Sequence, residues 1–296
     1  MKSFIKWILI ILVVMTIGTY IYEYYNKSNI STKKISSDSI DQSERTPLAD
    51  DNNQKVNTEV ENETFIKFIP IQELELPNDN TFVTHLAYTL SYNEEFEQAD
   101  WVAYVLSCSE TQGDIKRSNK FKVDEDIVSG SAENSDYSKS GYDRGHLMPA
   151  ADNSWNKTAM EQSFYYSNMS PQKPSFNRGI WKQLEEQVRD WACQFDSIYV
   201  VTGPIFSQNM LTIGTNKVAV PKYYYKAILY YTNSKIESIA FVLPNESSNK
   251  ELFTFAVSID SLEKLIKFDL FYKLNDKLES SIESRYNLNF WFNNVN

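Results

Sequence analysis

The chain has 296 residues and contains few of the residues on which small cross-linked or metal-stabilised proteins depend. Its two cysteines exclude a disulfide-rich scaffold and a cysteine-based zinc ribbon. Its two histidines exclude any metal site that needs three of them. Eight glycines and nine prolines exclude collagen and linker-like low complexity. The remaining sequence is 42% hydrophobic and 23% charged, so it can bury a sizeable core.

The balance of charge is acidic. A net charge of −10 argues against a protein coated with basic residues for nucleic-acid binding. A local basic groove stays compatible with this value, because the field at a site depends on the charges near it. One basic run, Lys116, Arg117, Lys120 and Lys122, could follow phosphates, and a solvated loop is the alternative.

The N-terminus is the longest apolar stretch. Residues 4–22 are apolar apart from a lysine near their start, and about 20 apolar residues span a bilayer. No clear cleavage site follows, so the stretch favours an uncleaved membrane anchor over a cleaved secretory signal. We therefore expect residues 1–22 to anchor or export the protein, with the folded domain in the periplasm or at the cell exterior. Cleavage would give a secreted form.

The next segment has the composition of a tether. Residues 23–65 are rich in Ser, Asn, Thr and Asp, their apolar residues are isolated, and no periodicity holds. From residue 66 onward apolar periodicity returns and no internal repeat is visible. The sequence therefore predicts a disordered tether over residues 23–65 and one folded domain over residues 66–296.

The folded part has mixed α and β patterns. Alternating stretches rich in β-branched and aromatic residues predict strands over residues 82–93, 100–107, 197–206, 218–231 and 236–244. A helix is predicted over residues 177–195, and a shorter one near residues 261–268. The longer helix has a core-facing stripe made of Trp181, Leu184, Val188, Trp191 and Phe195.

One short stretch combines residue types that suit catalysis. His146 follows an arginine and a glycine that permits a tight backbone, so it is a candidate general base beside an anionic substrate. Asn177 opens the predicted helix and Glu185 lies two turns further on. Their alternatives are a helix cap and a solvated helix face. His85, the other histidine, lies in an alternating strand and is expected to be a packing residue.

Three motifs together resemble a known family. Asp143-Arg144-Gly145-His146 is followed by N-M-S-P-Q from Asn168 and by N-x-G-x-W-x-x-L-E from Asn177 to Glu185. This series is similar to the DNA/RNA non-specific endonucleases, which are endonuclease G-like ββα-metal (His-Me finger) nucleases. The similarity extends over residues 66–296. It implies an α+β fold with a central, mostly antiparallel sheet flanked by helices.

The resemblance also implies a role for each motif residue. His146 would be the general base that takes a proton from the attacking water. Asn177 would be the only direct protein ligand of Mg²⁺, for which Mn²⁺ could substitute. Glu185 would orient water bound to the metal.

Three further residues receive roles from the same resemblance. Arg144 and Asn168 would line the site, and Arg117 would contact the phosphate in the transition state. The implied substrates are DNA and RNA. Family members often form homodimers, so a homodimer is a further expected partner, and no sequence feature identifies an inhibitor protein.

The expected function is that of a Mg²⁺-dependent, sequence-non-specific endonuclease that leaves 5′-phosphate ends on DNA and RNA. One alternative is an envelope phosphodiesterase that acts on nucleotides. Another is a weakly active nucleic-acid-binding domain that keeps the fold, although such a domain would be expected to lose His146 or Asn177. Cys108 and Cys193 could pair outside the cytoplasm or remain buried thiols.

Overall fold

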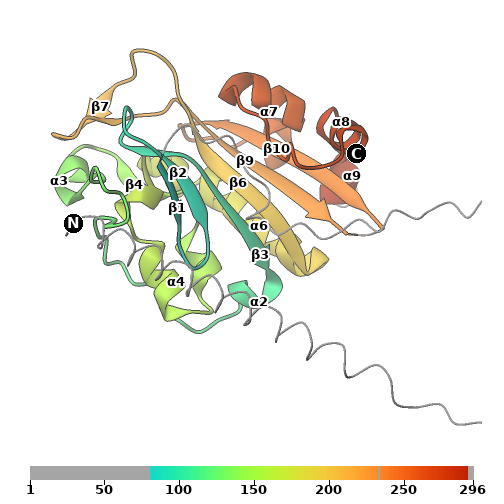
Figure 1. The fold of residues 1–296 in the computed structure, drawn as a ribbon, viewed down its shortest axis with the longest axis horizontal. Helices are drawn as coiled ribbons and strands as arrows, with labels where there is room; N and C mark the ends of the chain where they lie inside the picture. The colour runs from blue at the N-terminus through green and yellow to red at the C-terminus, as the bar shows by residue number, and fades with distance from the viewer. Residues whose placement is uncertain (1–80, 233, 293–296) are drawn as a thin grey trace, which may run out of the picture. The chain divides into compact units, whose positions relative to one another are not determined.

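The computed structural model describes residues 81–232 and 234–292, and their centre is a seven-stranded sheet (Figure 1). Its strand order is β1-β2-β3-β6-β9-β10-β11, and every neighbouring pair is antiparallel. The strands are β1 (Thr81–Thr84), β2 (Thr89–Asn93), β3 (Gln98–Ser107), β6 (Ser197–Ile205), β9 (Tyr223–Tyr231), β10 (Ile236–Pro244) and β11 (Ala256–Val257). This sheet with its helices confirms the predicted α+β class.

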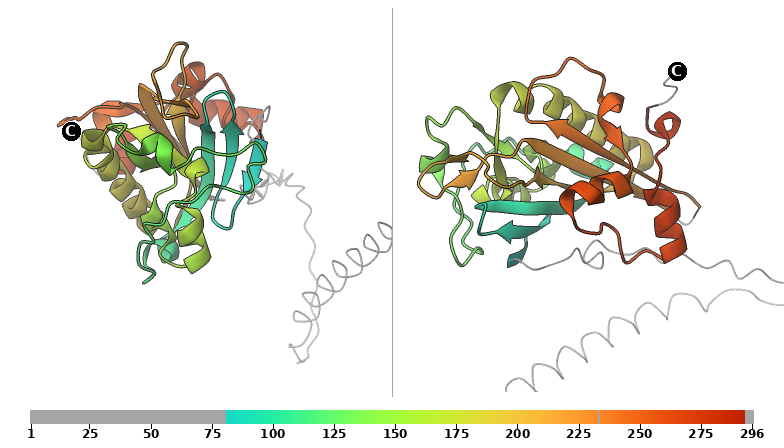
Figure 2. Two further views of the ribbon diagram at one scale, coloured as in Figure 1. Left: turned by 90° about the vertical axis from the view of Figure 1, so that its left-hand side faces the viewer. Right: turned by 90° about the horizontal axis from the view of Figure 1, so that it is seen from above.

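Helices cover both faces of this sheet (Figure 2). One face packs against α6 (Ile180–Phe195) and α9 (Leu288–Phe292), and the other against α7 (Ile259–Ile266) and α8 (Asp276–Glu283). The α6 stripe is buried as predicted at Trp181, Leu184, Val188 and Trp191, and Phe195 is partly buried at its end.

Smaller elements lie around the sheet. Two further two-stranded sheets pair β4 (Asp143–His146) with β5 (Met169–Gln172) and β7 (Thr212–Ile213) with β8 (Val218–Ala219). The short helices are α2 (Cys108–Thr111), α3 (Asn134–Tyr137), α4 (Lys157–Gln162), α5 (Pro174–Asn177), and the 3₁₀ turns η2 (Ala150–Asn153), η3 (Tyr166–Asn168) and η4 (Leu252–Phe255).

Several predicted elements are divided in the structure. The strand predicted over residues 218–231 is β8 and β9, separated at Pro221, which has no N–H to donate to a ladder. The stretch 82–93 is a hairpin, β1 and β2, whose turn is closed by a hydrogen bond from His85 N to Tyr88 O. The helix predicted over 177–195 is α5 and α6. It breaks at Gly179, where a Cβ would lie 2.4 Å from Ser175 O.

A disulfide joins Cys108 in α2 to Cys193 in the last turn of α6. The two cysteines are 85 residues apart in sequence. The bond therefore fixes the start of the loop that leads to Arg117 onto the long helix that carries Glu185.

No helix among the described residues is long and apolar enough to cross a membrane. α6 has 16 residues, so it measures about 24 Å against the ~30 Å of a hydrocarbon core, and it carries charged residues along its length. On this finding the prediction of a membrane-anchored protein is wrong. The predicted anchor, residues 4–22, and the predicted tether, residues 23–65, lie outside the described residues.

Candidate active site

The β4–β5 hairpin and the two helices that follow it form one wall of a cavity of about 430 Å³. His146 pairs with Met169 across the hairpin, and Gly145 pairs with Ser170. A Cβ at Gly145 would lie 2.1 Å from Cδ of Gln172, so only glycine lets the strands approach this closely. The cavity is lined by Arg117, Arg144, His146, Pro149, Ala150, Ala151, Asn177, Arg178, Lys182, Glu185 and Arg189.

His146 presents a neutral imidazole to this cavity. Its ring is buried, packs edge-on against Phe164 at 4.8 Å, and has no hydrogen-bond partner for Nε2 within the described part of the chain. Burial, helped by the positive charge of Arg117, lowers the pKa of His146 to about 3, and a hydrogen bond to the backbone of Arg144 opposes the shift. The imidazole is therefore neutral, which is the form that a general base needs, across the whole physiological pH range.

Asn177 is held by Asp143 from the same hairpin. Its Nδ2 donates to Asp143 Oδ2 at 2.9 Å, which turns the amide oxygen to the opposite side of the side chain. Arg178 binds the same carboxylate in a bidentate fashion, with distances of 2.8 and 2.7 Å. The residue before α6 is Gly179, so Asn177 is not the cap of the long helix. Its side chain is left available for a ligand.

Glu185 faces a group of buried charges instead of open solvent. Arg189 Nη1 donates to Asp152 Oδ1 at 2.9 Å, and Tyr104 Oη donates to the other oxygen of Asp152. Lys226, on β9, is fully buried with its ammonium 5.0 Å from the centre of the Trp181 ring.

The charge of Lys226 acts on Glu185. Burial raises the pKa of Glu185, and the positive charge of Lys226 is the strongest influence that opposes this rise. Burial likewise lowers the pKa of Lys226, while Glu185 and Asp152 oppose that change. Each group thus favours the charged form of the other.

Two arginines are fixed over aromatic rings. The guanidinium of Arg117 lies 5.0 Å from the centre of the Phe164 ring, and its Nε donates to Asn119 Oδ1 at 2.9 Å. Arg144 lies 5.1 Å from the Phe121 ring and donates to Tyr166 Oη at 3.1 Å. Such contacts restrict the arginine rotamers, so the positive charge is already in place before an anion arrives.

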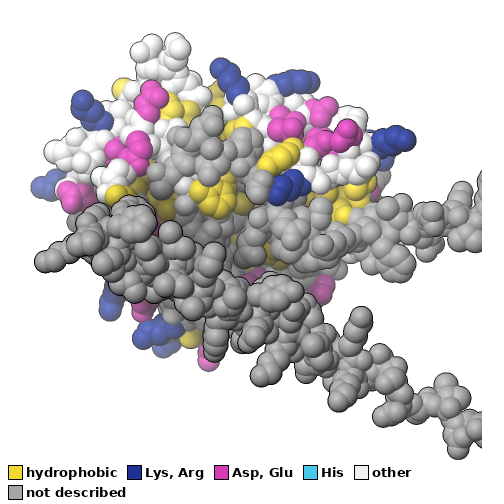
Figure 3. Space-filling model, in the orientation of Figure 1, with side chains coloured by type: hydrophobic (Ala, Val, Ile, Leu, Met, Phe, Trp, Pro, Cys, Tyr) yellow, Lys and Arg dark blue, Asp and Glu magenta, His cyan; other side chains and the backbone are white. Residues whose placement is uncertain are grey.

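The cavity is basic although the chain is acidic. Its lining has five cationic side chains, Arg117, Arg144, Arg178, Lys182 and Arg189, and one carboxylate, Glu185. Acidic residues gather instead over α7 and α8 (Figure 3) on the sheet face opposite α6, where burial raises the pKa of Glu283 to about 9. Separation of the charges lets the cavity attract a polyanion.

One predicted site residue does not line this cavity. Asn168 is fully buried, and its side chain accepts from Met148 N and donates to Met148 O and Ser163 O. These bonds hold the segment after His146 against the 3₁₀ turn before β5. Asn168 therefore stabilises the backbone next to His146 and does not contact the cavity.

Three charged lining residues escaped the sequence prediction, namely Arg178, Lys182 and Arg189. Lys182, Glu185 and Arg189 recur at steps of three and four residues, which places them on one face of α6, and Arg178 precedes them at the end of α5. This periodicity was the signal in the sequence. Of the basic run, Arg117 alone lines the cavity, while Lys122 pairs with Glu161 at 3.8 Å.

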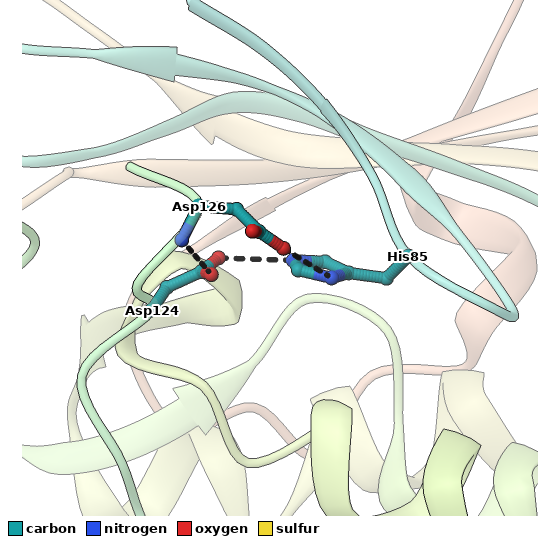
Figure 4. A group of neighbouring side chains, drawn as sticks. All are labelled: His85, Asp124 and Asp126. Atoms are coloured by element: carbon teal, nitrogen blue, oxygen red, sulfur yellow. Dashed lines mark hydrogen bonds and ion pairs between the residues drawn. The ribbon is translucent and has the colours of Figure 1, made fainter. Parts of the chain in front are cut away.

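His85 lies outside the cavity, as a packing residue would. Figure 4 shows its ring between Asp124 and Asp126, with Nε2 2.9 Å from Asp124 Oδ2 and Nδ1 3.7 Å from Asp126 Oδ2. Asp124 also accepts from Ser167 Oγ. The trio ties the β1–β2 turn to the loop before β4.

The donors in the cavity suit a hard divalent cation. Asn177 offers an amide oxygen and Glu185 a carboxylate, both oxygen groups of the kind that Mg²⁺ prefers. Mg²⁺ keeps several of its waters, so one protein oxygen together with substrate phosphate is a sufficient set. Soft sulfur ligands are missing from the lining, because both cysteines form the disulfide.

Comparison with known proteins agrees with this geometry. A model of the DNA/RNA non-specific endonuclease family matches residues 69–277. Mitochondrial endonuclease G of Bos taurus is 34% identical over 204 residues, which are 64% of this chain and 68% of that protein. Nuclease C1 of Cunninghamella echinulata var. echinulata is 36% identical over 211 residues, which are 66% of this chain and 84% of that protein.

Solved structures agree as well. A chain in the crystal structure of the EndoG/EndoGI complex, which addresses the mechanism of EndoG inhibition, superposes with a TM-score of 0.65. It is 31% identical and covers 70% of this chain and 92% of that chain. Proteins of this family generally depend on a divalent metal. The chain therefore belongs to the DNA/RNA non-specific endonuclease family and is a nuclease, a hydrolase that acts on nucleic acids.

Proposed function

We propose that this nuclease cuts DNA and RNA internally, without regard to sequence, in a Mg²⁺-dependent reaction that leaves 5′-phosphate ends. The observation that carries the proposal is that a neutral, buried imidazole, a carboxylate-anchored amide and two fixed arginines share one basic cavity. Both His146 and Asn177 are present there, which argues against a domain that keeps only the fold. The nuclease domain is assigned to residues 66–296.

His146 acts as the general base. Its Nε2 accepts a proton from the attacking water, because this nitrogen is the one that lacks a partner among the described residues. A hydrogen bond with the backbone of Arg144 helps to hold the orientation of the ring. The imidazolium that forms is stabilised by the negative phosphate in front of it.

Arg117 and Arg144 bind the phosphate and balance the charge that develops on it. Their guanidinium groups are positioned by rings and by neutral hydrogen-bond acceptors, and neither forms an ion pair with a carboxylate of the described residues. Contacts of this kind read the backbone and carry no base identity. Cleavage without sequence preference, on DNA and RNA alike, follows from this.

Asn177 would hold the metal through its amide oxygen, because Asp143 accepts a hydrogen bond from the amide nitrogen and fixes the side chain. Glu185, which lines the same cavity, would orient water bound to the metal. Mg²⁺, when bound, supplies Lewis-acid polarisation of the phosphate and neutralises charge on the leaving oxygen. Mn²⁺ has similar ligand preferences and is expected to replace it.

The test is incubation of the purified protein with supercoiled plasmid DNA, single-stranded RNA and a dinucleotide diester, with Mg²⁺, with Mn²⁺ and with a chelator. The proposal predicts nicked and then fragmented plasmid, degraded RNA and 5′-phosphate ends by mass spectrometry, all abolished by the chelator. Cleavage of the dinucleotide alone would point to a nucleotide phosphodiesterase. A mobility shift with no cleavage would point to a binding domain.

A further inference from the structure

A second cavity lies beside the catalytic one. It has a volume of about 370 Å³ and is walled by residues from five separate stretches of the chain. The side chains that matter here are Tyr142, Lys173, Leu211, Lys222, Tyr223 and Glu246.

The two cavities share the wall made by β4 and by the turn before α5. Tyr142 lines the second cavity, and Arg144, two residues on, lines the catalytic one. Lys173 lines the second cavity, and Asn177, one helical turn on, lines the catalytic one. Four extended residues measure ~13 Å, so the second cavity is within a few nucleotides of His146.

This shared wall is rigid. Asn245 is buried, accepts from Lys173 N at 2.8 Å, and donates to Pro171 O and Pro221 O at 3.1 and 3.0 Å. Tyr224, which follows Tyr223, is buried and donates to Pro171 O at 2.9 Å. The second cavity therefore keeps a fixed position relative to the helices that carry the metal ligand.

The cavity presents exposed apolar surface next to cations. Tyr223 is 47% exposed and Leu211 is 72% exposed, so both side chains can be reached from solvent at this cavity. Lys222 makes no ion pair with any described residue. Lys173 pairs with Glu246 at 3.1 Å, but both groups are exposed, so a phosphate can replace the carboxylate at little cost.

We propose that this second cavity binds an unpaired base and its phosphate from the strand whose neighbouring phosphodiester lies in the catalytic cavity. The inference rests on the proposed function and specifies its substrate further. Tyr223 stacks on the base, which every base permits because each has a π-face. Lys222 and Lys173 contact the phosphate. A base held in this way is out of its duplex, so the cavity favours single strands over double strands.

The experiment compares a substrate that is long enough to reach both cavities with one that is too small to do so, and each variant is referred to wild-type protein on the same substrate. Single-stranded oligothymidylate spans both cavities, whereas bis(p-nitrophenyl) phosphate is a diester without a base. For Tyr223→Ala, the ratio of kcat/KM on the oligonucleotide to kcat/KM on the diester is expected to fall ~5- to 150-fold. Tyr223→Phe keeps the ring and should keep the ratio. Tyr286→Ala removes an exposed tyrosine elsewhere, 38% exposed, and serves as the matched control.

A second readout is binding without cleavage. In chelator, Tyr223→Ala should weaken the affinity for labelled oligothymidylate by a similar factor, and Lys222→Ala should lower the slope of log affinity against log salt by about 1. An unchanged ratio in Tyr223→Ala, or an equal fall in Tyr223→Phe, would overturn the inference while wild-type cleavage leaves the proposed function standing. If wild-type protein cleaves neither substrate, the proposed function fails. In that case the binding measurement still tests the second cavity, and an unchanged oligonucleotide affinity in Tyr223→Ala would overturn its proposed role.

Discussion

Acid should destabilise this protein through a single buried histidine. His146 stays neutral in the folded state because burial and Arg117 lower its pKa to about 3, whereas an unfolded imidazole titrates near 6.5. The folded pKa lies below the unfolded one, so the unfolded state binds the proton first as the pH falls. The stability due to the neutral ring is complete above pH ~6.5 and is lost progressively toward pH ~3.

The size of the loss at a moderate pH follows directly. At pH 5 the unfolded imidazole gains about 2 kcal/mol from protonation, while the folded ring gains almost none. Because pH 5 is well above the folded pKa, the folded ring stays neutral at this pH. Folded domains typically have a free energy of unfolding of about 5–15 kcal/mol, and a single mutation typically changes it by ~1 kcal/mol. A loss of about 2 kcal/mol is therefore large enough to measure.

The assay is urea unfolding at pH 7 and pH 5, in chelator, for wild-type protein and His146→Gln. The glutamine cannot titrate, so the decrease in the free energy of unfolding between the two pH values should be about 2 kcal/mol smaller in the variant. Taking this difference cancels the contribution of groups that titrate alike in both proteins. An identical decrease would refute the view that the folded imidazole resists protonation.

Three other predictions concern separate parts of the site. Asn177→Ala should keep its fold by circular dichroism and raise the Mg²⁺ concentration for half-maximal cleavage ~10-fold or more, because the amide oxygen is lost. Lys226→Met removes the cation that most favours ionised Glu185, so the acid limb of kcat/KM should move to higher pH, and an unmoved limb would contradict the coupling. Cys108→Ser with Cys193→Ser opens a link across 85 residues and should lower the free energy of unfolding by roughly 2–5 kcal/mol in urea titrations.

The main groups of the cavity could be predicted from the sequence because their motifs lie close together along the chain. The two segments that carry His146 and Asn177 are neighbours in one hairpin and its following helix, so their residues meet without help from distant parts. Their roles in the reaction stay predictions. The same locality explains the core stripe of α6, which depends only on the 3.6-residue period.

Other features of the site and the fold depend on tertiary packing, which a local sequence pattern does not predict. Asn168 has the residue type of a ligand, but three hydrogen bonds to distant backbone use up its amide. Lys226 lies in an apolar strand where a lysine is expected to reach solvent, and its burial depends on acids from α6 and η2. The break at Gly179 depends on a close approach to Ser175 O, which only the folded chain defines.

Comparison of the two histidines tests most directly whether His146 is the general base. Supercoiled plasmid cleavage in Mg²⁺ is measured for His146→Ala and His85→Ala at equal folded fraction. His146→Ala should lose ~10²- to 10⁴-fold in rate and still bind DNA, because Arg117 and Arg144 remain. His85→Ala should keep its rate and lose only stability, since its ring pairs with Asp124 away from the cavity. An inactive His85→Ala beside a fully active His146→Ala would contradict the claim.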